Sequence, residues 1–373
     1  MGFTVFWCPY DYLPYMRGDE GMDYPMKILH ISPHLGGGVG TVIMDWIDKD
    51  INNHYKIALL DYANDKAKKW WLTKNSFLHS LYPKMAEYPD ILNRLISEAD
   101  IVLIHYWDHP MLADLFAGEI PDCRMVFWCH KNIKYPWKQV RYPDRFIDTS
   151  PVQTGGSCYS YIWSTGNMER FLAIEPKPHE GFNIGYVGTV DYKKIHPNFI
   201  SICNEIMKFI PDVHFTFIGD VNKELLLSFF QPPPLPPLPL SSYKFTFTGN
   251  VDDVAPYLAE MDVFGYSLRP DHYGTCEIVL GEAMATGIPC VVMNNPVERT
   301  IITDTFNGFI GDETYYIGAI ELLYRQPGLR IGVGINARNH AGKLYSIDTM
   351  IASWEQVFQE MIQKPKTRKE GLK

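Results

Sequence analysis

Short apolar runs alternate with glycine turns and amphipathic stretches from Met26 onward. Residues 27–32 have the pattern of a buried strand, a glycine-rich turn follows, and residues 41–48 have helical periodicity. Strand, glycine turn and helix in this order open a doubly wound α/β domain. Further strands are predicted at residues 55–60, 101–105, 125–129 and 145–148. Helical or polar stretches separate them, so the alternation predicts a parallel sheet.

The pattern restarts after residues 174–181, a linker that contains Pro176 and Pro178. A helix is then predicted at 198–210, and strands at 182–188, 214–218, 245–248, 263–266 and 289–293. Near the end of the chain, residues 347–362 have the period of an amphipathic helix. The sequence therefore predicts an appendage at 1–25, α/β domains at 26–178 and 179–346, and a crossing helix with a basic tail at 347–373.

Composition narrows the class of protein. With 373 residues, 46% of them hydrophobic, the chain can form large cores, unlike a disordered chain. A formal charge of -9 gives no general attraction to nucleic acid. Seven cysteines without a Cys-x-x-Cys pair favour a reducing compartment. The start lacks the features of a signal peptide, and no run of about 18 apolar residues is present, so we expect a cytoplasmic protein.

The first candidate site is the glycine turn at residues 36–41, GGGVGT. Glycine N–H groups can come close to a phosphate, and the helix that follows adds its dipole. The dinucleotide fingerprint has a third glycine where this chain has Thr41, while Asp61 lies near the place of its ribose-binding acid. A nucleotide-dependent oxidoreductase is therefore one alternative, and a tight turn without a ligand is another.

The second candidate is residues 188–197, GTVDYKKIHP, where Lys193 and Lys194 follow a strand and can meet a diphosphate as point charges. A solvated loop is the alternative.

The third candidate, residues 273–289, reads YGTCEIVLGEAMATGIP. Its small-residue turn, Gly274 to Cys276, predicts a cradle of N–H groups at a helix start. Glu282 lies in an otherwise apolar helix and needs a partner, such as the paired hydroxyls of a ribose or hexose. Glu277 would lie about 140° from it on a helix, so both face one side only if Glu277 precedes the helix.

Together these motifs resemble the donor-binding region of glycosyltransferase family 4, which has the GT-B fold. The resemblance covers roughly residues 26–361 and includes HLGGGVG, YVGTVDYKK, FTFIGD, EIVLGEAMATGIPCVV and NNPVERTIITDTFNGFI. It implies two facing Rossmann-like domains, with the C-terminal helix returning toward the first. It also implies an enzyme that transfers a sugar from a nucleotide-sugar donor to a glycan, lipid-linked or small-molecule acceptor. Retention of configuration and independence of metals or other cofactors are expected.

The resemblance also implies roles for single residues. Glu282 matches a ribose-binding glutamate, Lys194 a lysine that neutralises the diphosphate, and His130 a histidine that faces the donor sugar. The remaining donor contacts implied in the same way, or by the turn before the helix, are Gly37, Gly38, Lys193, Gly249, Asn250, Gly274, Thr275 and Cys276.

Two positions depart from the family pattern. Its first glutamate should fall at Gly274, and the arginine that partners the lysine should fall at Thr189. We expect Glu277 to substitute for the glutamate as a catalytic residue beside His130 and Lys194, and Lys193 to compensate for the arginine. A catalytically silent GT-B scaffold is the further alternative.

Two other segments carry predictions. Basic and tryptophan side chains gather at Lys66, Lys68, Lys69, Trp70 and Trp71. Such a mixture suits contact with the inner face of a membrane, and a surface helix with inward-packed tryptophans is the alternative. Residues 231–242 hold six prolines and are predicted to be a surface insertion.

Overall fold

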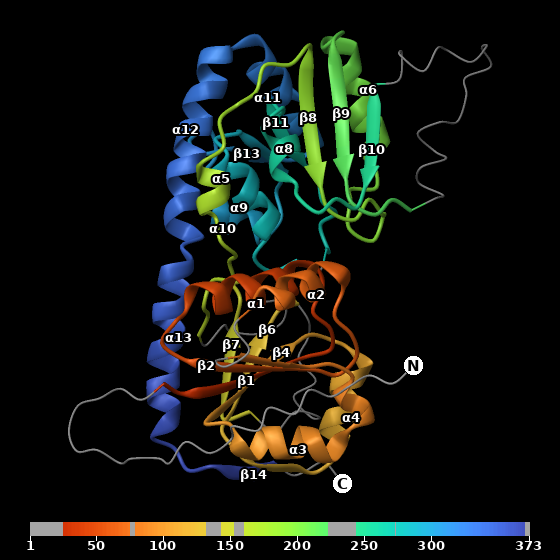
Figure 1. Cartoon of the computed structure of the whole chain (residues 1–373). Helices are drawn as coiled ribbons and strands as arrows, with labels where there is room; N and C mark the ends of the chain where they lie inside the picture. The colour runs from red at the N-terminus through yellow and green to blue at the C-terminus, as the bar shows by residue number, and fades with distance from the viewer. Residues whose placement is uncertain are drawn as a thin grey trace.

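The computed structural model describes residues 25–74, 79–131, 143–152, 160–222, 244–272 and 274–369. The predicted appendage at 1–25 lies almost wholly outside these residues, and the proline-rich segment 231–242 wholly so. Two α/β domains follow one another along the chain, each built on a six-stranded parallel sheet (Figure 1). The predicted fold class is therefore confirmed.

The first sheet has the order β3-β2-β1-β4-β6-β7. Its strands are β1 (Lys27–Ser32), β2 (His54–Leu59), β3 (His79–Tyr82), β4 (Ile101–Tyr106), β6 (Met125–Cys129) and β7 (Arg145–Asp148). The connecting helices are α1 (Gly37–Lys49), α2 (Asp65–Leu72), η1 (Met85–Glu87), α3 (Pro89–Glu98) and α4 (Pro110–Ala117). A small antiparallel pair consists of β5 (Ile120–Cys123) and β14 (Thr367–Lys369).

The second sheet has the order β10-β9-β8-β11-β12-β13. Its strands are β8 (Phe182–Val187), β9 (Val213–Ile218), β10 (Phe245–Gly249), β11 (Val263–Tyr266), β12 (Cys290–Met293) and β13 (Phe309–Gly311). Its helices are α5 (Glu169–Leu172), α6 (Phe199–Phe209), α8 (Ala255–Leu258), α9 (Ile278–Ala285), α10 (Glu298–Ile301), α11 (Glu313–Arg325) and α12 (Pro327–Leu344).

The last helix, α13 (Ile347–Ile362), returns to the first domain. Its apolar face, which includes Trp354 and Phe358, packs in the core beneath β1, β2 and β4. α12 and α13 thus run in succession along the second and then the first domain (Figure 1). The chain crosses in the other direction between Ile162, in the first core, and Met168, in the second, a few residues before the predicted linker. The two crossings touch, because the Thr165 hydroxyl donates to the Tyr345 carbonyl at 3.0 Å.

The hydrophobic pattern located the strands well, since buried parallel strands form nearly continuous apolar runs. β1, β6, β7, β11 and α13 have the predicted bounds. The first helix differs, because α1 begins at Gly37 and includes the predicted turn. Strands β3, β5, β13 and β14 were not predicted, since they are short and lie at sheet edges.

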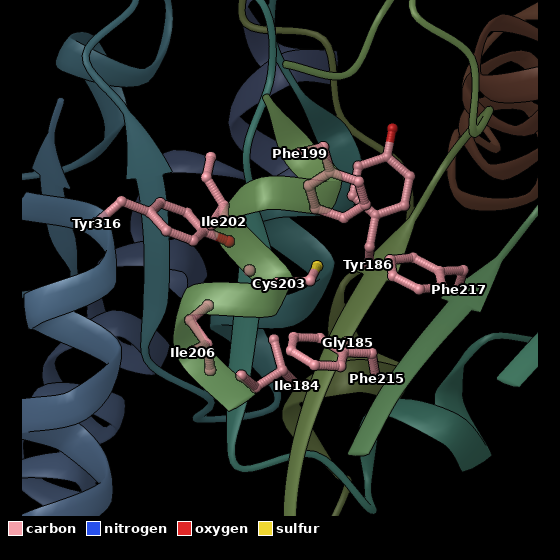
Figure 2. Close-up of a pocket in the computed structure, with 11 residues that line it drawn as sticks. Ile184, Gly185, Tyr186, Phe199, Ile202, Cys203, Ile206, Phe215, Phe217 and Tyr316 are labelled. Atoms are coloured by element: carbon pink, nitrogen blue, oxygen red, sulfur yellow. The ribbon is translucent and has the colours of Figure 1, made fainter. Parts of the chain in front are cut away.

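Within the second core, α6 leaves a small void against β8 and β9. Figure 2 shows Phe199 and Cys203 of α6 on the side of Tyr186 and Phe217 of the strands, and Ile202 on the side of Tyr316. The void is about 10 Å³, near the minimum space for one water molecule. It is a packing defect inside one domain and is too small to bind a substrate.

Across the described residues, no helix is both long and apolar enough to cross a membrane.

Candidate functional site

The two domains meet near the carboxyl ends of their central strands. The Thr275 hydroxyl, just before α9, donates to the main-chain carbonyl of His130, just after β6, at 3.3 Å. Helices α1 and α2 line the same boundary (Figure 1). Ligands of open α/β sheets bind at this edge, so the candidate site lies between the domains.

Lys194 places its positively charged amine at the carboxyl edge of the second sheet. Its amine lies 3.7 Å from a Glu277 carboxylate oxygen and 5.4 Å from the centre of the Tyr266 ring. The loop that carries it follows β8 and is fastened by Arg269, whose guanidinium donates to the Tyr192 carbonyl at 2.9 Å. The positive charge is therefore fixed in place.

Glu277 is buried and caps α9 with a left-handed backbone, φ 40° and ψ 60°. Glu277 thus precedes the helix. The sequence requires this position if Glu277 and Glu282 are to face the same side. The Tyr266 hydroxyl donates to its carboxylate. Burial opposes the charge, but Lys194 and His272 outweigh burial and lower the pKa of Glu277. The carboxylate is therefore ionised at neutral pH.

Gly274 leaves the space in which the Glu277 carboxylate lies. A Cβ atom on Gly274 would be 1.5 Å from Oε1 of Glu277, so a side chain at 274 and this carboxylate exclude one another. The Gly274 N–H donates to Nδ1 of His272 at 3.0 Å. The other ring nitrogen of His272 lies 3.1 Å from a carboxylate oxygen of the fully buried Glu298. The Gly274 amide predicted as part of a cradle is thus already bonded within the protein.

Glu282 has a carboxylate without a hydrogen bond to any residue that the structure describes. Burial raises its pKa to about 7, against the attraction of Arg170 and Lys66. Lys66 belongs to α2 of the first domain and Arg170 to α5 of the second. Glu282 therefore faces charges from both sides of the boundary.

The predicted glycines lie at the start of α1 and at the end of β10. Gly37 and Gly38 are exposed in the first turn of α1, and a Cβ on either would meet nothing within 4 Å. Gly249 ends β10 with φ 69°, and its carbonyl accepts from the Gly219 N–H at 2.9 Å. The Asn250 amide donates to Asp220 at 2.6 Å.

His130 is the outermost of three hydrogen-bonded histidines. Its Nε2 lies 3.0 Å from Nδ1 of His105, and Nε2 of His105 lies 2.9 Å from Nδ1 of His30. Burial lowers the pKa of both His30 and His130 to about 3, and lowers that of His105 well below its ordinary value. All three imidazoles are therefore neutral.

Several predicted residues lie apart from Lys194 and Glu277. Lys193 is exposed, so its side chain is not brought to Glu277 as that of Lys194 is. The Cys276 side chain is buried, and burial raises the pKa of its thiol to about 12. The Thr189 carbonyl accepts from the Tyr186 hydroxyl at 3.0 Å.

The basic-tryptophan segment forms α2. Lys66, Lys68 and Lys69 are exposed, whereas Trp70 packs against the first core and donates to Asp48 at 2.8 Å. One tryptophan is thus committed to packing, as in the alternative prediction. Membrane contact stays a prediction.

Four residues that support the site were not predicted from the sequence: His30, Tyr266, His272 and Glu298. Strand alternation was an available signal. Residues of equal parity on one strand share a face, so His30 and His105 lie on the α1 and α13 side with Ile28 and Leu103.

Comparison with known proteins bears on the fold and the second domain. Residues 181–325 match the family model described as glycosyl transferases group 1. No curated protein matches the sequence.

Among solved structures, the chain is similar to HepE of Anabaena in complex with UDP and glucose, with a TM-score of 0.70, 15% identity, and coverage of 90% of this chain and 100% of that one. It is also similar to sucrose-phosphate synthase of Thermosynechococcus elongatus, with a TM-score of 0.65, 15% identity, and coverage of 90% and 99%. A glycosyltransferase of Rickettsia africae gives a TM-score of 0.67 at 15% identity, with coverage of 91% and 99%.

At these identities the structures show the fold, which is GT-B as the resemblance implied. The family match favours a glycosyltransferase domain over an oxidoreductase, and the silent scaffold stays an alternative. Assignment to family 4 in particular stays a prediction. The second domain thus matches the glycosyl transferases group 1 family over residues 181–325, and the chain has the GT-B fold.

Proposed function

We propose that the protein transfers a sugar from a nucleoside diphosphate sugar to an acceptor hydroxyl, with retention of configuration. One observation carries the proposal: the Lys194 amine is fixed beside the buried carboxylate of Glu277, and Thr275 joins the same turn to His130 of the opposite domain. A diphosphate needs a cation, and a sugar needs acceptors and donors for its hydroxyls. This cluster offers them across one boundary.

In the proposed reaction, Lys194 stabilises the charge that develops on the departing diphosphate. Gly37 and Gly38 present N–H groups at the start of α1 and add the positive end of its dipole. Glu277 accepts from sugar hydroxyls and tolerates positive charge on the sugar carbon. His130, which is neutral, faces that carbon without repelling it. The acceptor attacks from the side of the leaving group, and no protein nucleophile is required.

The donor experiment follows from the neighbours. HepE was solved with UDP and glucose, so UDP-glucose is the first donor to test. We expect calorimetric titration to detect UDP binding, and donor hydrolysis to release UDP. The anomeric proton of the product, followed by NMR, decides between retention and inversion. Binding of a nicotinamide dinucleotide in place of UDP would overturn the proposal.

Metal independence and membrane contact belong to the same proposal. Leaving-group charge is handled by Lys194 and the α1 amides in the scheme above, so activity is expected to survive EDTA. Exposed Lys66, Lys68 and Lys69 on α2 would meet anionic headgroups. Co-sedimentation with anionic vesicles tests this contact, and absence of binding removes the membrane from the proposal.

Glu282 predicts a pH dependence of nucleotide binding. Its pKa of about 7 exceeds the ordinary 4.5, so the carboxylate ionises as pH rises through 7. The ionised form can accept from two ribose hydroxyls with its two oxygens, whereas protonation turns one of these oxygens into a donor. UDP affinity, measured by titration calorimetry from pH 5.5 to 8.5, should therefore rise and then level off above about pH 8.

Glu282→Gln should abolish that rise and weaken UDP binding at pH 8. The sign for stability is opposite. A carboxyl whose pKa is raised in the folded state disfavours folding once it is ionised, so this cost is absent below pH 4.5 and fully present above 7. Glu282→Gln should therefore raise the melting temperature at pH 8. Unchanged pH dependence in this variant would contradict the assignment.

Substitutions at two glycines of α1 test the effects on UDP binding and on folding separately. Gly38→Ala places a Cβ in open space at the boundary, whereas in Gly40→Ala the Cβ would lie 2.8 Å from a main-chain carbon of Leu35. Alanine stabilises a helix relative to glycine by about 1 kcal/mol. Gly38→Ala should thus keep or raise the melting temperature and weaken UDP binding. Gly40→Ala should lower the melting temperature, and equal effects of both variants would argue against a ligand at Gly38.

A further inference from the structure

Three histidines cross the first sheet in a line. His30 lies within β1, His105 near the end of β4 and His130 just beyond β6, and these strands are neighbours in the sheet. Successive rings are nearly parallel, at 19° and 18°, with centres 5.1 Å apart. His30 and His105 are fully buried, and His130 is half buried. The line thus runs from the core of the domain to the boundary with the second domain.

A neutral imidazole has one N–H and one bare nitrogen. In a line of neutral imidazoles joined by N···N hydrogen bonds, every ring must therefore donate in the same direction. Either each Nδ1–H donates outward, so that His130 presents an N–H at the boundary, or each Nε2–H donates inward, so that His130 presents a bare nitrogen. The inner end of the line decides between these two arrangements.

At the inner end, no acceptor among the described residues lies within hydrogen-bonding distance of Nε2 of His30. Nε2 of His30 is buried and has no hydrogen-bond partner among the described residues, and the same holds for the indole N–H of its neighbour Trp46. The Tyr55 hydroxyl beside them donates to Asp50. An N–H on Nε2 of His30 would add a second unpaired donor here, and orphaned buried N–H groups are rarer than orphaned acceptors. A bare Nε2 is therefore favoured, and the line donates outward.

We propose that His30 and His105 are positioning residues that hold His130 in the Nδ1–H tautomer, so that its N–H is directed to an oxygen of the transferred sugar. Nδ1 of His130 has no hydrogen bond to a described residue, and its carbonyl is fixed by Thr275 of the second domain. The sugar as recipient rests on the proposed function, whereas the tautomer does not.

The arrangement suits a reaction with positive charge on the sugar carbon. An imidazolium at this place would repel that charge, but burial keeps all three rings neutral at physiological pH. Hydrogen bonds in a chain polarise one another, so the outward N–H of His130 donates more strongly than that of an isolated imidazole. His130 thus supplies a strong donor without a charge.

The tautomer is measured directly on the full chain by ¹⁵N-histidine labelling and two-dimensional NMR, in which protonated and bare ring nitrogens have distinct ¹⁵N shifts. The chain has 12 histidines, and comparison with His130→Gln identifies the signals of His130. We expect a protonated Nδ1 and a bare Nε2 at pH 7.5. A protonated Nε2, or an averaged mixture of the two forms, would overturn the proposal.

Two substitutions at His105 test the line. Glutamine can accept from His30 through its carbonyl and donate to His130 through its amide, whereas leucine can do neither. His105→Gln should keep the tautomer and most activity. His105→Leu should give mixed tautomers and about a tenfold lower kcat with UDP-glucose, the effect of roughly one hydrogen bond.

A matched control is His214→Gln, because His214 bonds Thr246 in the second sheet, whereas the three histidines of the line lie at the first sheet. It should change neither the His130 signals nor kcat. Circular dichroism of each variant identifies any loss of folding, and the wild-type spectrum remains decisive if His105→Leu does not fold. If the tautomer is as expected but no nucleotide sugar is turned over, the proposed function fails and the hydrogen-bonded line stands.

Discussion

Replacement of Lys194 by alanine should lower kcat with a nucleotide-sugar donor about 10²–10³-fold, the usual effect of removing one preorganised group that stabilises charge in a transition state. The reason is the position of its amine, which Glu277 and the Tyr266 ring hold at the carboxyl edge of the second sheet. Release of UDP from UDP-glucose, followed at saturating donor, measures the effect.

The structure also predicts a secondary effect on stability. Glu277 is buried, so the loss of Lys194 removes the cation beside its carboxylate. His272 and the Tyr266 hydroxyl remain as partners, so the variant should fold with a lower melting temperature. Kinetics are therefore compared at a temperature at which circular dichroism shows both proteins folded.

Lys193→Ala is the matched control, because Lys193 is adjacent in the chain and exposed. It should change kcat less than tenfold, since surface charges are screened by solvent. Wild-type turnover in folded Lys194→Ala would remove Lys194 from the catalytic proposal. Equal losses in both variants would indicate a general effect of charge on donor attraction instead.

The sequence predicted the sheets because their strands are buried on both faces. β6 and β11, for example, have no exposed residue to blur the apolar run. Edge strand β3 has only partly buried residues, and its pattern is correspondingly weak. The order of strands in each sheet then follows from the doubly wound connections, which explains why local periodicity led to the correct fold.

Residues of the candidate site could be predicted only where a local sequence pattern indicated their role. Lys194 and Glu282 follow strand or helix signals and lie at the domain boundary. The line of histidines was not predicted, because it joins residues on three strands and depends on the register of β1, β4 and β6. The left-handed backbone of Glu277 was also hidden, since a glutamate gives no sign of positive φ.

A variant with glutamate at position 274 and glycine at position 277 should keep the carboxylate that Glu277 supplies in the native chain. Glu277 has a φ of 40°, a conformation that costs a residue with a side chain roughly 1–2 kcal/mol and costs glycine little. Its carboxyl carbon lies 2.8 Å from the place of a Cβ on Gly274. That distance is close to the separation of Cβ and the carboxyl carbon within one glutamate. A glutamate at 274 can therefore bring its carboxylate to nearly the same place, provided that position 277 is glycine.

Glu277→Gly should relieve the backbone strain but lower kcat/KM about 10²-fold, because Lys194 and Tyr266 lose their common partner. Gly274→Glu alone should be severely destabilised, since its Cβ would meet the Glu277 carboxylate. In the double variant, the new glutamate supplies the missing carboxylate and the new glycine removes the clash. Its kcat/KM should therefore exceed that of Glu277→Gly, and its melting temperature should exceed that of Gly274→Glu. Such non-additivity is the signature of two residues that share one space. A double variant no more active than Glu277→Gly would show that the carboxylate must come from position 277, and that its strained backbone is part of the site.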